Sequence, residues 1–178
     1  PSKGKTARLM QLADMLVVTG SQSNVRSAYS SGTPAIGVGM GNVVTIVDET
    51  ADLDDAAHKI QRSKCFDNAT SCSSENAVIV VDSAYDDCVR ALQRVGGMLL
   101  DESQTAHLVA THWRNGHLNR NMLAQNIDAV LVTLGMADMA PQNTKFLIAP
   151  ASGIGPNSPV SGEKMALFLA LYLSLIHI

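Results

Sequence analysis

Cys72 is the side chain in this sequence best suited to covalent chemistry, because its thiol stands among small polar residues just before an apolar run. The stretch KCFDNATSCSSENAVIVV extends from Lys64 to Val81, and its apolar end predicts a buried strand. A free cysteine has a pKa of about 8.5, and the thiolate is the nucleophile. Peptide N–H groups around a tight loop can lower that pKa and stabilise an oxyanion. The stretch therefore predicts a nucleophilic cysteine.

A structural role is the alternative for each of the three cysteines, since cysteine is a common buried residue. Cys65 and Cys88 fall within helical patterns, and we expect both to be structural. Cys72 has polar neighbours on both sides, and the small Ser73 and Ser74 leave room for a substrate. These neighbours favour the reactive role for Cys72, and local sequence alone leaves the structural role open.

Two other stretches have features of nucleotide contacts. VVTGSQSNV (17–25) predicts a strand, a turn and a helix, and exposed N–H groups at a helix N-terminus favour phosphate. It holds only Gly20 of the usual dinucleotide glycine triplet, so an ordinary turn is the alternative. GVGMGN (37–42) has three glycines at alternate positions without the Lys-Ser/Thr of a Walker loop. It suits either close approach to a flat ligand or a turn between domains.

The remaining polar residues give weaker signals. The histidines at 58, 107, 112 and 117 are predicted to lie on the surface or on helix faces. No CxxC or HxxxH arrangement is present, so we expect no metal site. Glu163, within SGEKM, is either a site residue or a solvated helix cap.

Composition limits the class of protein. Of 178 residues, 46% are hydrophobic but only 4% aromatic, so the core must rest on aliphatic side chains, as is common in α/β proteins. The net charge is −3 without a basic patch, which argues against nucleic acid as a partner. Three cysteines without paired spacing argue against a disulfide framework and indicate a reducing cytoplasm. The apolar run at 165–178 is shorter than the roughly 20 residues that span a bilayer, so no membrane contact is expected.

Alternating strand and helix patterns predict an α/β fold with a parallel sheet. One strand–helix–strand unit ends in the glycines at 37–41, and the pattern then begins again. The expected strands are residues 14–20, 33–39, 43–48, 76–82 and 145–150, and the expected helices are residues 5–12, 21–32, 52–66, 83–96 and 103–114. The stretch around Gly135 and Pro141 is predicted to be irregular, and the start of the run at 165–178 is a candidate buried strand.

Taken together, these stretches resemble the CoA-acylating branch of the aldehyde dehydrogenase superfamily. The resemblance rests on Thr-Gly after the first strand and on four motifs in family order: AYSSGTPAIGVGMGN (28–42), DETAD (48–52), KCFDNATSCSSENAVIV (64–80) and GEK (162–164). It covers nearly all of residues 6–172. It implies a parallel-sheet aldehyde dehydrogenase catalytic domain preceded by the last βαβ unit of a Rossmann-like cofactor domain.

The resemblance also implies domain limits and site residues. Residues 1–41 would be the C-terminal part of the dinucleotide-binding domain, residues 42–172 an incomplete catalytic domain, and residues 173–178 a non-native tail, so we expect a fragment. Cys72 falls on the family's nucleophile. The family's NAD or NADP contacts fall on Thr19, Gly20 and Ser21 beside the phosphates, Val38 and Gly39 along the nicotinamide, and Glu163 at the nicotinamide ribose.

The implied reaction oxidises a short aldehyde through a cysteine thioester, with coenzyme A as co-substrate. Hydrolytic aldehyde dehydrogenases carry a water-activating glutamate in the glycine stretch, whereas residues 37–42 hold no carboxylate. A thiol ionises more easily than water, so this absence favours transfer to coenzyme A. Sulfoacetaldehyde, acetaldehyde and succinate semialdehyde are candidate substrates, and a full-length protein is expected to form homo-oligomers. A hydrolytic dehydrogenase and a truncated, non-catalytic chain are the alternatives.

Overall fold

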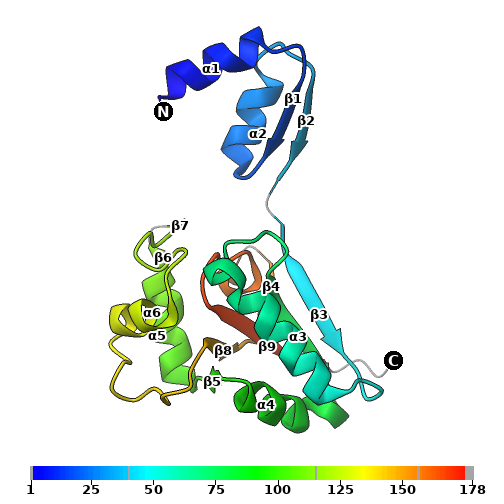
Figure 1. Cartoon of the computed structure of the whole chain (residues 1–178), viewed down its shortest axis with the longest axis vertical. Coiled ribbons are helices and arrows are strands. Elements are labelled where there is room, and N and C mark those ends of the chain that lie inside the picture. Colours follow the sequence, from blue (N-terminus) through cyan, green and yellow to red (C-terminus); the bar gives the residue numbers. More distant parts are fainter. Residues whose placement is uncertain (1, 40, 115, 156, 175–178) are drawn as a thin grey trace. The chain divides into compact units, whose positions relative to one another are not determined.

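The structure is a computed structural model that describes residues 2–39, 41–114, 116–155 and 157–174. The chain divides into two compact units, Pro1–Gly41 and a second unit that begins at Asn42. Figure 1 traces the helices and strands of both units.

The first unit is a strand–helix–strand motif with one additional helix. Its elements are α1 (Lys3–Leu12), β1 (Leu16–Thr19), α2 (Gln22–Tyr29) and β2 (Ala35–Val38). The two strands pair in parallel, with Leu16 opposite Ala35 and Thr19 opposite Val38. Val25 and Ala28 of α2 are buried. The predicted strand–helix–strand pattern of this region is confirmed.

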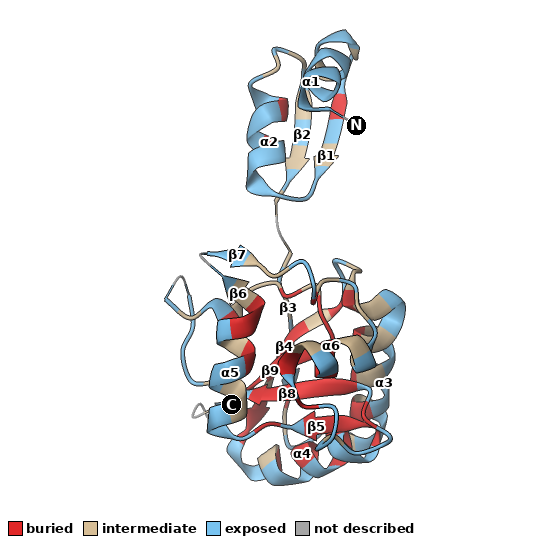
Figure 2. Cartoon of the chain, turned by 90° about the vertical axis from the view of Figure 1, so that its left-hand side faces the viewer, coloured by how far each residue is buried: buried red, intermediate tan, exposed pale blue. Residues whose placement is uncertain are grey.

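The second unit is built on a five-stranded parallel sheet, seen in Figure 2 as strands whose residues are largely buried. In spatial order the strands are β3 (Val43–Val47), β4 (Glu75–Val81), β9 (Phe168–Ser174), β8 (Phe146–Pro150) and β5 (Gly97–Leu99). Every pairing in this sheet is parallel. The candidate buried strand at the start of the 165–178 run is therefore the central strand β9.

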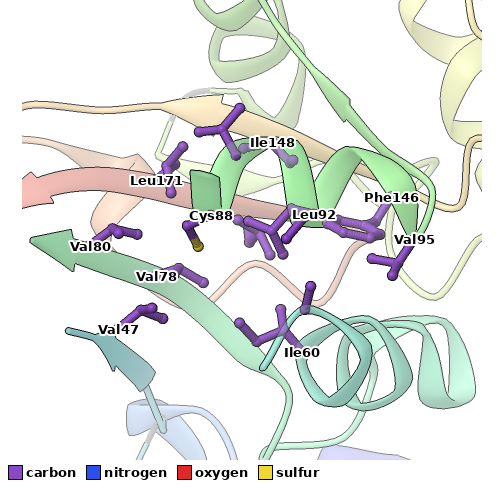
Figure 3. Close-up of a cluster of buried hydrophobic side chains, with 14 of the residues drawn as sticks. Val47, Ile60, Val78, Val80, Cys88, Leu92, Val95, Phe146, Ile148 and Leu171 are labelled. Atoms are coloured by element: carbon purple, nitrogen blue, oxygen red, sulfur yellow. The ribbon is translucent and has the colours of Figure 1, made fainter. Parts of the chain in front are cut away.

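Helices cover both faces of this sheet, which is why its inner strands β8 and β9 are apolar along almost their whole length. On one face, α3 (Leu53–Cys65) and α4 (Tyr85–Arg94) pack on the strand side chains that point to that face, such as Val78 and Leu171. Figure 3 shows this cluster, in which the sulfur of Cys88 lies among aliphatic side chains. On the other face, α5 (Glu102–His112) and α6 (Ile127–Leu134) pack on residues such as Phe168. The predicted α/β fold with a parallel sheet is confirmed.

Some elements differ from the predicted ones. The helix expected at 103–114 ends at His112, and a short antiparallel hairpin follows, formed by β6 (Trp113–Arg114) and β7 (His117–Leu118). Helix α6, for which no element was predicted, begins after the N-cap Asn126 and ends at Leu134, before Gly135 in the left-handed conformation. The stretch after it, around Pro141, is irregular as predicted. Leu173 and Ser174 complete β9, and the rest of the predicted tail lies outside the described residues. No helix within the described ranges is long and apolar enough to cross a membrane.

Candidate active site

Cys72 lies in a short loop between the 3-10 helix η1 (Phe66–Ala69) and strand β4, and its side chain is exposed. The backbone N–H of Ser74 donates to the carbonyl oxygen of Ser71 at 3.0 Å, which closes a tight turn around the cysteine. The hydroxyl oxygens of Ser71 and Ser73 are 2.8 Å apart. The thiol is thus presented to solvent by a hydrogen-bonded turn at the amino end of a central strand.

The three residues of η1 before this turn adopt left-handed backbone conformations. Asp67, Asn68 and Ala69 have φ values of 48°, 51° and 62°. Each such conformation costs a non-glycine residue about 1–2 kcal/mol, and it persists only where the surroundings enforce it. Here the Thr70 hydroxyl donates to the Asp67 carboxylate at 2.7 Å, and the Asn68 side-chain amide donates to the carbonyl of Ala124 at 3.2 Å. Strained backbone of this kind is concentrated at functional sites.

A groove of about 390 Å³ opens beside the cysteine turn. Its described lining residues are Lys59, Arg62, Ser63, Phe66, Ser71 and Ser73. Two of them are the immediate neighbours of Cys72 in the chain, and the others come from the end of α3 and the residue that follows it. The groove therefore lies beside the turn that carries the candidate nucleophile, and residues on both sides of Cys72 line it.

A group of buried polar side chains contacts the start of β4, the strand that follows the cysteine turn. Lys164, fully buried, donates from Nζ to the carbonyl of Gly162 at 2.9 Å. Its backbone N–H donates to Asn76 Oδ1 at 3.2 Å, and its carbonyl oxygen lies 2.9 Å from His112 Nε2. These contacts join the GEK segment to β4 and to the end of α5. His112, the last residue of α5, is also fully buried and packs edge-on against Phe168 at 4.9 Å between ring centroids. Of its two predicted positions, the surface or a helix face, the surface is wrong.

Burial shifts the pKa values of these polar side chains and of the nearby Lys64. Desolvation lowers the pKa of Lys164 to about 7, and nearby Lys64 lowers it further in the same direction. Desolvation also lowers the pKa of Lys64 to about 8, opposed by the charge of Glu75. The pKa of His112 falls to about 4, because burial disfavours the imidazolium more than its contact with the Lys164 carbonyl favours it. Within the described part of the chain, neither lysine forms an ion pair.

Sequence reasoning missed this buried group, although one signal for it was present. Lys64 follows Ala57 and Ile60 at helical spacing, so it falls on the apolar face of α3 and turns inward with them. Lys64 Nζ has no hydrogen-bond partner within the described ranges. The burial of Lys164 depends on strand β9, whose position in the centre of the sheet cannot be inferred from the GEK motif.

The predicted dinucleotide contacts of the first unit lie at one edge of its small sheet. Thr19 and Val38 pair at the carboxyl ends of β1 and β2. Gly20, with φ 117°, follows β1, and Gly39 follows β2. Ser21 is the N-cap of α2, and its hydroxyl accepts from the Asn24 N–H at 3.4 Å. The carboxyl end of a parallel strand pair and a helix N-terminus are suited to the phosphates of a dinucleotide, so these residues fit NAD(P)⁺.

Glu163 belongs to the second unit, together with Cys72. It is half-buried and lies between the 3-10 helix η3 (Pro159–Ser161) and β9. No α-helix begins there, so the alternative role as a helix cap is wrong. The role of Glu163 at a nicotinamide ribose stays a prediction.

The described residues contain no group of three or more His, Cys, Asp or Glu side chains that could hold a metal ion.

Comparison with known proteins defines the class. The profile of the Aldehyde dehydrogenase family matches residues 9–111, which is more than half of the chain. The chain belongs to this family. The predicted resemblance is thereby confirmed.

Particular relatives are acylating enzymes. Sulfoacetaldehyde dehydrogenase (acylating) from Cupriavidus necator is 48% identical over 96% of this chain and 35% of its own length. The crystal structure of an acetylating aldehyde dehydrogenase from Geobacillus thermoglucosidasius has a TM-score of 0.92 at 33% identity, over 98% of this chain and 38% of that one. A propionaldehyde dehydrogenase from Rhodopseudomonas palustris, with bound CoA and an acylated cysteine, has a TM-score of 0.86 at 25% identity, over 98% of this chain and 40% of that one. The chain spans about a third of the length of such relatives.

Proposed function

We propose that this chain carries the thioester-forming site of a CoA-acylating aldehyde dehydrogenase, which oxidises a short aldehyde with NAD(P)⁺ and coenzyme A to an acyl-CoA. The observation that carries the proposal is the exposed thiol of Cys72, in a turn that follows strained backbone and whose flanking residues Ser71 and Ser73 line a groove. The acylating relatives support it. The acylated cysteine in one of them is the chemistry proposed for Cys72.

The proposed reaction begins with the Cys72 thiolate, which attacks the carbonyl carbon of the aldehyde and forms a C–S bond. The carbonyl oxygen becomes an oxyanion, and backbone N–H groups of the turn are available to stabilise it. When bound, NAD(P)⁺ would supply the hydride acceptor. Residues from Thr19 to Ser21, Val38 and Gly39 would hold it on the first unit, and the contact predicted for Glu163 is with its nicotinamide ribose. Loss of hydride leaves a thioester on Cys72. The thiol of coenzyme A then attacks the thioester carbon and releases the Cys72 thiolate.

Coenzyme A is the proposed acyl acceptor because the glycine stretch at 37–42 holds no carboxylate to activate water. The protein incubated with a short aldehyde and NAD(P)⁺ is expected to give acyl-CoA, with little product when coenzyme A is omitted. Chromatography of the products with and without coenzyme A measures this. Free acid formed at the same rate in both reactions would instead support a hydrolytic dehydrogenase, and no product in either would support the non-catalytic alternative.

A cytoplasmic location and homo-oligomer formation accompany this proposal as predictions. The odd number of unpaired cysteines supports a reducing compartment.

A further inference from the structure

The groove beside Cys72 is cationic. Among the described residues its lining holds two cationic side chains, three hydroxyl groups and one aromatic ring, but no carboxylate. Its volume of about 390 Å³ lies within the range of small-molecule sites. Such a lining favours a small ligand that carries negative charge.

Arg62 is the cation in this groove that is available to a ligand. Lys59 Nζ is 2.6 Å from Asp55 Oδ2, one turn earlier on the exposed face of α3, so its charge is largely matched. The guanidinium of Arg62 is exposed, and it has no hydrogen-bond or ion-pair partner in the described ranges. A planar guanidinium binds sulfonate or carboxylate oxygens through parallel hydrogen bonds, which a lysine cannot match.

We propose that this groove binds the anionic group of the aldehyde substrate, a sulfonate or a carboxylate, with Arg62 as the main recognition residue. The hydroxyl of Ser63 can donate a further hydrogen bond to the same group, as can whichever of the Ser71 and Ser73 hydroxyls does not donate to the other. The inference rests on the proposed function in one respect, namely that Cys72 is the nucleophile.

The position of the groove limits how far the anion lies from the reacting carbon. Ser71 and Ser73, on either side of Cys72, are themselves part of the wall. A group bound against Ser71 or Ser73 is next to Cys72 along the chain, which suits a short aldehyde with a charged end. The phosphates of coenzyme A are separated from its thiol by the long pantetheine arm, so they do not fit this position as well.

The inference is tested by the rate at which charged and neutral reagents modify Cys72. The chain is treated with sulfonatoethyl methanethiosulfonate, which is anionic, or with neutral methyl methanethiosulfonate, and modification of Cys72 is followed by peptide mass spectrometry. We expect Arg62→Gln to lower the anionic rate about threefold to tenfold and to leave the neutral rate unchanged, because one nearby charge is removed. The difference is expected to shrink in 0.5 M salt, where the Debye length is only a few ångströms.

A second variant controls for a general change of charge. Arg90→Gln removes one positive charge from α4, outside the groove. It is expected to change the anionic rate less than twofold. Equal loss in Arg62→Gln and Arg90→Gln would overturn the inference. Slow modification of Cys72 by both reagents would instead count against the proposed function, so the two failures are distinguishable.

Protection experiments identify the source of the anion. Millimolar ethanesulfonate or propionate is expected to slow modification of Cys72 by the neutral reagent, whereas dimethyl sulfone, which is uncharged, is not. Stronger protection by ethanesulfonate would assign the groove to sulfonates, and stronger protection by propionate to carboxylates. Protection by adenosine 3′,5′-bisphosphate alone would overturn the assignment to the aldehyde and point to coenzyme A.

Discussion

Replacement of Cys72 by serine is expected to lower aldehyde oxidation by at least about a thousandfold, the largest effect of any single change in this chain. A serine hydroxyl has the size to fit the turn, but without an adjacent base it is a far weaker nucleophile than a thiolate. Formation of NAD(P)H in the presence of aldehyde and coenzyme A measures the loss. The turn itself should persist, since it is closed by backbone and serine hydrogen bonds rather than by the sulfur.

Cys65→Ser is the matched control for this substitution. Cys65 ends α3, is half-buried, and lies seven positions before Cys72 on the other side of the strained segment. Burial raises the pKa of its thiol, so it is a poor nucleophile near neutral pH. We expect Cys65→Ser to keep more than half of the activity. If activity survived in Cys72→Ser and were lost in Cys65→Ser, the nucleophile would be Cys65, which would contradict the assignment to Cys72.

Replacement of Lys164 by methionine is expected to stabilise the chain at pH 7, on the order of 2–4 kcal/mol. The pKa of Lys164 is about 7 in the native state against 10.5 in the unfolded chain, so the unfolded state binds more protons between these values. The native state with Lys164 therefore gains stability as pH rises through this window. Methionine removes the desolvation cost and retains most of the volume, although the Gly162 carbonyl loses its donor.

The gain from Lys164→Met should fall by about half between pH 7 and pH 9, because the wild-type lysine loses its proton in the folded state over that range. Urea unfolding at several pH values measures this. Lys59→Met is the control, since Lys59 is exposed and its contact with Asp55 raises its pKa. A pH-independent gain from Lys164→Met would contradict the buried-charge account.

The sequence predicted those features that depend on local pattern. The strand–helix–strand unit around Gly20 follows from a helix cap and apolar periodicity, both of which are local. The exposed position of Cys72 follows from its polar neighbours and from the strand that begins three residues later. The apolar run that forms β9 could be predicted to be a buried strand from its composition. Its position between β4 and β8 is set by the topology of the sheet, which no local pattern specifies.

Other features of the site required the structure. The left-handed backbone from Asp67 to Ala69 has no glycine to signal it, since only the surrounding contacts stabilise it. The groove forms because the last turns of α3 fold back beside the residues next to Cys72, and this proximity is tertiary. His112 lies on a helix, one of its two predicted positions, but it is buried because α5 ends against β9, whose Phe168 packs on the ring.

Transfer of an acyl group from acetyl-CoA to the chain tests the central claim most directly, because the last step of the proposed reaction is reversible and its reversal requires no hydride acceptor. After incubation and digestion, mass spectrometry is expected to find the acetyl group on the peptide that carries Cys72, in amounts that fall when free coenzyme A is added. Absence of acetylation at Cys72, or equal acetylation of Cys65, would contradict the account.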